Sequence, residues 1–245
     1  MDLLPFNAVH VDLVHPDDPD AWAQHEAYLA LLSPEERDRM ARLVFERDRR
    51  RFLLTRALVR TMLSRYAGVA PAEWTFIANV HGRPEILDRP QGVPDLRFNL
   101  SHTEGLIACA VTIGREVGVD VEHIQRRLTR DVAGRFFAPS EVNHLKALAE
   151  DEQARAFFDY WTLKEAYIKA RGFGLALPLA DFAFTLSPPA PPQIAFEPAL
   201  EDDPATWQFA QDWPTPVHRL ALAVRREGHD LPVRIRTVVP RVTPK

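Results

Sequence analysis

Residues 118–124 read GVDVEHI and place two acids, Asp120 and Glu122, on alternate positions between valines. On a β-strand, side chains at i and i+2 lie on the same face, about 6.5 Å apart along the chain. Two carboxylates on one face repel each other unless a positive group lies between them, and oxygen ligands are those that Mg²⁺ prefers. The pair therefore indicates a candidate Mg²⁺ site. The alternative is a solvent-facing strand edge with two acids.

A second segment, WTLKEAYIKARG at residues 161–172, has the periodicity of a helix that is apolar around most of its circumference. Such a helix belongs inside a protein, where charges are costly unless they are paired or bound to a metal. It nevertheless carries Lys164, Glu165 and Lys169. These residues indicate either an internal ion pair or part of a functional site. Glu165 follows Asp120 by 45 positions, so only packing of this helix against the acidic strand could bring the two carboxylates together.

The elements that must position these residues occur twice. Residues 32–78 and 137–184 both contain a proline-led helix start, a long helical pattern, a glycine stop, a second proline and an alternating strand. This order predicts an internal duplication. The alternative is two unrelated helix-helix-strand units. At an offset of 105 positions Glu165 falls against Arg60, so we expect the second half to carry the acidic chemistry.

Positive charge gathers in residues 35–65, which hold ten arginines and five acids for a net charge of +5, whereas the whole chain has a net charge of -4. A positive face favours a phosphate-bearing or acidic partner. The alternative is a solvated helix with internal Glu/Arg pairs. The acidic net charge and the lack of a binding motif argue against a nucleic-acid partner.

The bulk composition suits a cytoplasmic protein. The chain has 245 residues, of which 46% are hydrophobic, and a single cysteine, Cys109, which excludes an intramolecular disulfide and suits a reducing compartment. The N-terminus has no basic region typical of a secretory signal. No apolar run approaches the roughly 20 residues of a membrane helix, so we expect no membrane partner.

Taken together, the acidic strand and the charged helix resemble the signature of the 4′-phosphopantetheinyl transferases, specifically of the larger surfactin-synthetase-activating type. That signature is a Gly-hydrophobic-Asp-hydrophobic-Glu strand and a W-x-x-K-E-A-x-x-K helix, which here begins 39 positions after the strand's glutamate. The segments FNLSH (98–102), GRP (82–84) and RFFAPSE (135–141) also resemble parts of that family. The resemblance spans about residues 33–186.

The resemblance implies an α+β fold, a pseudo-dimer of two similar α+β halves with one active site at their junction. It places the coenzyme A phosphate and adenine contacts in an N-terminal half, residues 1–113. It places the Mg²⁺-binding carboxylates and the KEA helix in a C-terminal half, residues 114–245.

The implied reaction moves 4′-phosphopantetheine from coenzyme A to a serine of an apo acyl or peptidyl carrier protein and releases adenosine 3′,5′-bisphosphate. The implied metal ligands are Asp120, Glu122 and Glu165, and the catalytic candidates are Glu165, Lys169 and Glu141. The implied coenzyme A contacts are Arg39, Arg51, Gly82, Arg83, Pro84, Ser101, His102, Lys164 and Lys169. Lys169 would offset charge on the transferred phosphoryl group, whereas Lys164 could instead brace the site.

Some roles stay open at this level. Glu165, Glu141 or a metal-bound water could take the serine proton. Related proteins often carry a lysine where this chain has Glu36, and Arg37 and Arg39 could supply the charge of that lysine.

Rival functions are a metal-dependent phosphohydrolase and an inactive relative that only binds coenzyme A. The sequence does not identify the carrier protein. A duplicated chain that builds its own site should act as a monomer.

Overall fold

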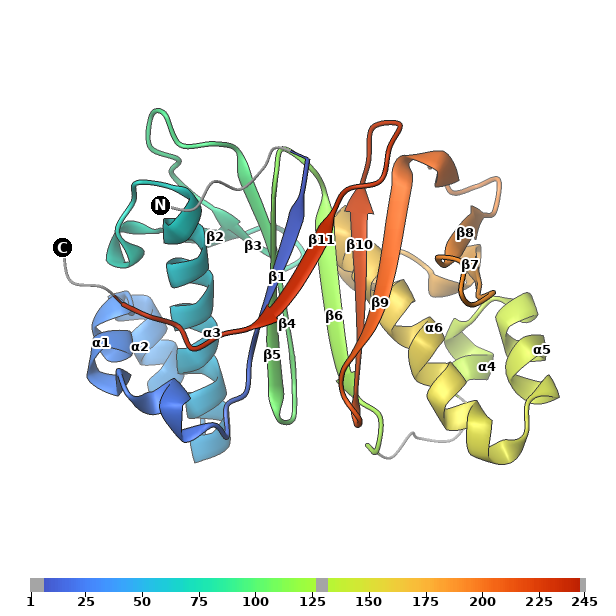
Figure 1. The fold of residues 1–245 in the computed structure, drawn as a ribbon, viewed down its shortest axis with the longest axis horizontal. Coiled ribbons are helices and arrows are strands. Elements are labelled where there is room, and N and C mark those ends of the chain that lie inside the picture. The colour runs from blue at the N-terminus through green and yellow to red at the C-terminus, as the bar shows by residue number, and fades with distance from the viewer. Residues whose placement is uncertain (1–6, 127–131, 243–245) are drawn as a thin grey trace. The chain divides into compact units, whose positions relative to one another are not determined.

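The computed structural model describes residues 7–126 and 132–242 and has two structural units, each with helices packed on a β-sheet (Figure 1). The first unit comprises Met1–Gly114 together with the chain from Pro232 onward, and the second comprises Arg115–Leu231. Each unit has its own hydrophobic core. The α+β class predicted from the sequence is confirmed.

The first unit is built on a four-stranded sheet with the order β11-β1-β5-β4. Strand β5 pairs antiparallel with β1 and with β4, whereas β11 runs parallel to β1. The long helix α3 packs on this sheet, and a small hairpin, β2–β3, lies beside β4. The elements are β1 (Val9–Val14), η1 (Pro19–Trp22), α1 (His25–Leu31), α2 (Pro34–Ala41), α3 (Glu46–Tyr66), η2 (Pro71–Glu73), β2 (Phe76–Ala78), β3 (Pro84–Ile86), β4 (Leu96–Thr103), β5 (Leu106–Ile113) and β11 (Val233–Thr237).

The second unit is built on a three-stranded antiparallel sheet with the order β6-β10-β9. The long helix α6 packs on this sheet and makes its most extensive contacts with β6. A second small hairpin is formed by β7 and β8. The elements are β6 (Val117–His123), α4 (Val132–Phe136), α5 (Pro139–Ala147), α6 (Glu150–Arg171), η3 (Gly174–Ala176), η4 (Leu179–Asp181), β7 (Phe182–Thr185), β8 (Gln193–Phe196), η5 (Pro204–Thr206), β9 (Trp207–Thr215) and β10 (His218–Arg225).

The two units repeat one order of elements. Each contains a short helix with proline at its first turn, a long helix of 21 or 22 residues, a two-stranded hairpin and an antiparallel pair of longer strands. Each sheet adds an earlier strand, β1 or β6, beside the second strand of that pair. The predicted duplication is therefore visible in the topology of the sheets as well as in the helices.

The C-terminal tail differs from the division expected at residues 113 and 114. Strand β11 belongs to the first unit because its residues pair with β1, from Val9 with Val233 to Leu13 with Thr237. The assignment of separate roles to the two halves stays a prediction. Across residues 7–126 and 132–242, every helix is too short or too polar to cross a membrane.

Candidate active site

Strand β6 carries the two acids of the GVDVE segment. Asp120 and Glu122 lie two positions apart and pair with Ala221 and Arg219 of β10. Asp120 is buried, and the side chain of Glu122 is 13% exposed. Both carboxylates therefore lie in a low-dielectric environment, where their mutual repulsion is weakly screened.

Helix α6 lies directly against β6 because of a glycine. A Cβ atom at Gly118 would be 2.0 Å from the carbonyl oxygen of Ala166 and 2.4 Å from the amide nitrogen of Ala170. No side chain fits in that space, so the first glycine of the motif sets the close approach of strand and helix. Without this approach, α6 could not hold its side chains against the acids.

One stripe of α6 faces the acidic strand. Trp161, Glu165 and Lys169 recur at intervals of four residues and so share a face of the helix. The indole nitrogen of Trp161 donates to Glu122 at 3.0 Å, and the Lys169 ammonium donates to Asp120 at 2.6 Å. The predicted packing of the KEA helix across the DVE strand is thus present within the second unit.

The three acids influence one another electrostatically. Burial, and then the charge of Asp120, raise the pKa of Glu165 to about 7, although Lys169 opposes the shift. Burial, followed by the charge of Asp120, also raises the pKa of Glu122 to about 7, whereas Arg126 lowers it. Such acids are stabilised in their ionised form by an added cation.

A divalent cation fits this donor set chemically. The acids supply only carboxylate oxygens, which suit Mg²⁺, and burial together with the charge of Asp120 raises the pKa of Glu122 and of Glu165. Their oxygens are currently engaged by basic and indole donors, Lys169 on Asp120 and both Arg126 and Trp161 on Glu122. Within the described part of the chain, the side chains do not form a ready-made group of three around a metal position.

Glu141 and Lys164 form an enclosed ion pair. The Lys164 ammonium lies 2.8 Å from Glu141 and donates to the carbonyl oxygens of Leu179 and Phe182 at 2.7 and 2.6 Å. Glu141 also accepts from the amide of Phe184 and from that of Ala138, which begins α5. Burial raises the pKa of Glu141 and lowers the pKa of Lys164, and each charge opposes the shift of the other. These contacts favour the bracing alternative for Lys164 and give Glu141 the same supporting task.

The first unit contains the same brace. Arg60 of α3 donates to Glu36 of α2 at 2.8 Å, and Glu36 accepts from the amide at the start of its helix, as Glu141 does. Arg60 therefore matches Lys164, an offset of 104 positions along the long helices. The offset of 105 was read from the prolines of the short helices, and it holds there for Glu36 and Glu141. Along the long helices it is wrong by one residue, so Glu165 does not fall against Arg60.

A second ion pair confirms the register. In the first unit, Arg65 of α3 donates to the buried Asp12 of β1 at 2.7 Å. Arg65 and Lys169 are again 104 positions apart, so Arg65–Asp12 repeats Lys169–Asp120. In both units, therefore, one ion pair joins the long helix to the short helix and another joins the long helix to a strand.

What differs between the copies is the remaining acidic chemistry. Three residues of the second unit's site are replaced in the first unit. When Asp120 is aligned with Asp12, Glu122 corresponds to Val14; along the long helices, Glu165 and Trp161 correspond to Thr61 and Ala57. The close approach is lost too, since His10 and Tyr66 occupy the places of Gly118 and Ala170 and hydrogen bond to each other at 2.6 Å. The fold shared by the two units therefore does not require Glu122, Glu165 or Trp161.

The predicted coenzyme A contacts other than Lys164 and Lys169 all belong to the first unit. Arg39 of α2 is exposed, Arg51 of α3 pairs with Asp48 at 2.8 Å, Ser101 of β4 is buried and His102 is exposed. In the loop between β2 and β3, Gly82 has φ +83° and precedes Arg83 and Pro84. Asn79 shapes this loop by accepting from the Arg83 amide at 3.0 Å. Their roles stay predictions.

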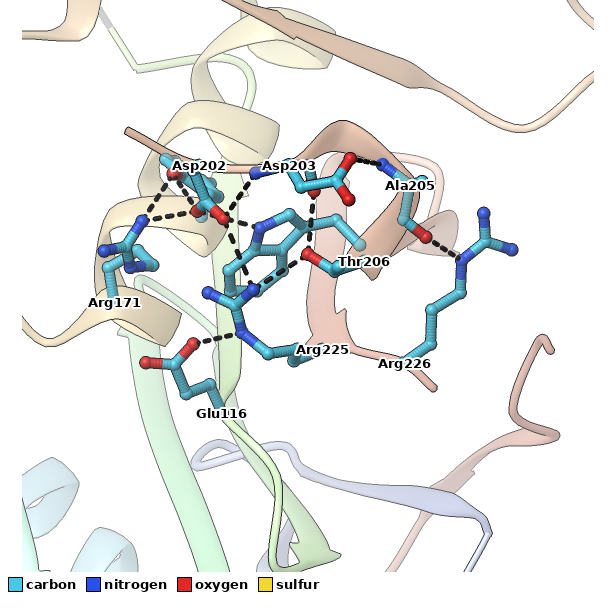
Figure 2. Close-up of polar contacts among 10 residues, drawn as sticks. Glu116, Arg171, Asp202, Asp203, Ala205, Thr206, Arg225 and Arg226 are labelled. Atoms are coloured by element: carbon cyan, nitrogen blue, oxygen red, sulfur yellow. Dashed lines mark hydrogen bonds and ion pairs between the residues drawn. The ribbon is translucent and has the colours of Figure 1, made fainter. Parts of the chain in front are cut away.

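Sequence reasoning missed an anchor at the C-terminal end of α6 (Figure 2). Asp202 accepts hydrogen bonds from Tyr167 at 2.7 Å and from Arg171, both on the last turns of α6. It also accepts from Trp207 of β9 at 2.9 Å and from Arg225 of β10 at 3.3 Å. This network ties the helix that carries Lys169 to the sheet. Asp202 lies in a run of acids, EDD, that gives no sign of such a role.

Sequence comparison shows the family of the chain. The sequence model of the 4′-phosphopantetheinyl transferase superfamily matches residues 116–224, and that of the 4′-phosphopantetheinyl transferase N-terminal region matches residues 19–113. The 4′-phosphopantetheinyl transferase HetI of Nostoc sp. is 38% identical over 78% of this chain and 79% of its own length. The 4′-phosphopantetheinyl transferase Sfp of Bacillus subtilis is 33% identical over 71% of this chain and 75% of its own.

A holo-(acyl-carrier-protein) synthase of Bacillus anthracis, solved in complex with CoA (3′,5′-ADP), matches 46% of this chain and 96% of its own with 17% identity and a TM-score of 0.39. From the sequence relatives, the chain belongs to the 4′-phosphopantetheinyl transferase superfamily. It is an enzyme of the phosphopantetheine-transferring class.

Proposed function

We propose that this enzyme transfers 4′-phosphopantetheine from coenzyme A to a serine of an apo acyl or peptidyl carrier protein, with Mg²⁺ as the cofactor. The serine oxygen forms a bond to the phosphorus that carries pantetheine, and the bond from that phosphorus to the leaving phosphate breaks. Adenosine 3′,5′-bisphosphate is released, and the serine proton passes to a base. The observation that carries the proposal is the placement of Glu122 and Glu165 around Asp120, where the first unit has the neutral residues Val14 and Thr61.

Asp120, Glu122 and Glu165 would hold the Mg²⁺. The cation, when bound, would neutralise charge on the pyrophosphate oxygens. Lys169 lies beside Asp120 and would offset negative charge on the transferred phosphoryl group. Among the two carboxylates considered for the serine proton, Glu165 is partly exposed whereas Glu141 is enclosed. We therefore assign the proton transfer to Glu165.

Arg39, Arg51, Ser101 and His102, with the Gly82–Pro84 loop, are the proposed coenzyme A contacts of the first unit. The duplicated chain contains both sets of residues, so we propose that one copy is active as a monomer. The fully buried free thiol of Cys109 fits a reducing compartment, and we propose the cytoplasm as the site of action.

The test is the intact mass of an apo acyl carrier protein after incubation with enzyme, coenzyme A and Mg²⁺. We expect a gain of one phosphopantetheine group that EDTA or a Ser→Ala change in the carrier abolishes. A peptidyl carrier domain is tested in parallel. Coenzyme A consumption without modification of either carrier would contradict the proposal in favour of a phosphohydrolase, and coenzyme A binding without consumption would favour an inactive relative.

A further inference from the structure

Glu122 receives two donors on the same oxygen. Trp161 donates its indole N–H to Oε1 at 3.0 Å, and Arg126 donates to Oε1 at 2.8 Å. In the part of the chain that the structure describes, neither donor uses Oε2. The second oxygen is therefore the one that can be presented to an incoming ligand while the first stays held.

The two donors differ in packing and charge. The Trp161 ring stacks on Phe157 with centroids 5.8 Å apart and also contacts Phe136 and Phe137. Aromatic packing on several sides fixes the direction of its N–H. Arg126 is a long cationic side chain that is 45% exposed. Trp161 is thus a neutral donor held by aromatic packing, whereas Arg126 is a half-exposed cation.

The first unit provides an internal comparison. At the positions of Trp161 and Glu122 it has Ala57 and Val14, so the indole donor and its carboxylate acceptor are absent together. The ion pair that links the long helix to the short helix is present in both units. A purely packing role for Trp161 would not require Glu122, whereas a role in orienting that carboxylate would.

We propose that Trp161 is a positioning residue that fixes Oε1 of Glu122 so that Oε2 is presented to a divalent cation, and that Arg126 is the counter-ion with which the cation competes. This inference rests on the proposed function. Partners that orient a metal ligand typically change metal affinity by about 10- to 100-fold when they are removed. Removal of a competing positive charge should act in the opposite direction, because it leaves more negative potential for the cation.

The experiment measures Mg²⁺ binding by calorimetry with coenzyme A present and no carrier protein, so that no turnover occurs. Trp161→Phe keeps the aromatic stack and removes only the N–H. We expect its Mg²⁺ dissociation constant to rise by about 10-fold or more. Arg126→Gln is expected to lower the dissociation constant.

Trp74→Phe is the matched control, since Trp74 is a buried indole of the first unit that donates to Ser64 at 2.8 Å. We expect its Mg²⁺ affinity to equal that of the wild type. Unchanged Mg²⁺ affinity in Trp161→Phe, or an equal loss in Trp74→Phe, would overturn the inference and leave the proposed function intact. A wild-type protein that neither binds Mg²⁺ nor modifies a carrier would instead overturn the proposed function.

Discussion

Replacement of Lys164 by methionine tests the enclosed ion pair that braces α6. Neither Lys164 nor Glu141 has exposed side-chain surface, and the ammonium donates three bonds of 2.6 to 2.8 Å. Methionine keeps a similar length but leaves the Glu141 charge and two carbonyl oxygens without their cation. Removal of one partner of such a pair costs about 3–5 kcal/mol in the free energy of unfolding.

The expected loss is large enough for a thermal melt. For chains of 150–250 residues, 1 kcal/mol shifts the melting temperature by roughly 2–4 °C, so Lys164→Met should lower it by roughly 6–20 °C. Lys146→Met on the exposed surface of α5 is the control, with an expected change within about 0.5 kcal/mol. The double variant Lys164→Met/Glu141→Gln should regain part of the loss, because it removes the buried charge while an amide can still accept from the backbone.

The pH dependence gives a second signature of the same ion pair. Burial already raises the pKa of Glu141, and loss of Lys164 removes the charge that opposes this shift. Glu141 would therefore bind a proton more readily in the folded than in the unfolded variant, and the destabilisation should be smaller at pH 5.5 than at pH 8. A loss as small as that of Lys146→Met, or a destabilisation that grows as the pH falls, would refute the reasoning.

Three further predictions concern α6 and the acids beside it. Gly118→Ala should destabilise the protein by about 1–3 kcal/mol or more and reduce carrier modification, because the added Cβ meets the backbone of Ala166. The control is Gly68→Ala, where an added Cβ has nothing within 4 Å. Equal melting temperatures of the two variants would contradict this account. Asp202→Asn should lower the free energy of unfolding by about 2–4 kcal/mol, because it weakens the charge-assisted bonds that hold the end of α6. Urea denaturation should show a lower midpoint, and an unchanged midpoint would show that the network is dispensable. Without metal, the raised pKa values of Glu122 and Glu165 predict that stability falls as pH rises from 4.5 to about 7. The free energy of unfolding should fall by at most about 3 kcal/mol for each carboxyl. Thermal melts in EDTA should show this fall, and Glu165→Gln should reduce it. A rise in stability over the same pH range would contradict the account.

Much of the second unit's site could be predicted from the sequence because its residues lie on regular elements. Period-2 alternation placed Asp120 and Glu122 on one face of a strand, and helical periodicity placed Glu165 and Lys169 on one face of a helix. The charge of Lys164 in an apolar segment indicated either an internal ion pair or part of a site, and the structure shows an ion pair with Glu141. Its partner could not be derived from spacing, because Glu141 comes from another helix.

What the sequence did not show depends on tertiary contacts. The hydrogen bonds of Trp161 and Arg126 to Glu122 need the packing of α6 on β6, and Asp202 acts from a loop whose local sequence is typical of a solvated turn. The pairing of β11 with β1 joins residues more than 200 positions apart, a distance at which local patterns carry no information. The register of the duplication was set by ion pairs, which correct the sequence offset by one residue.

We infer that the acids on β6 and α6 carry the chemistry, whereas the Glu141–Lys164 pair and its counterpart Glu36–Arg60 maintain the fold. The most direct test compares the rate of carrier modification by Glu165→Gln and Glu141→Gln, at saturating Mg²⁺ and a temperature at which circular dichroism shows both variants folded. We expect a fall of about 100-fold or more for Glu165→Gln, in line with the loss of a charge that acts on the reacting groups. Glu141→Gln should retain a rate within a few-fold of the wild type, with a lower melting temperature. A normal rate for Glu165→Gln, or a larger loss for Glu141→Gln, would contradict the account.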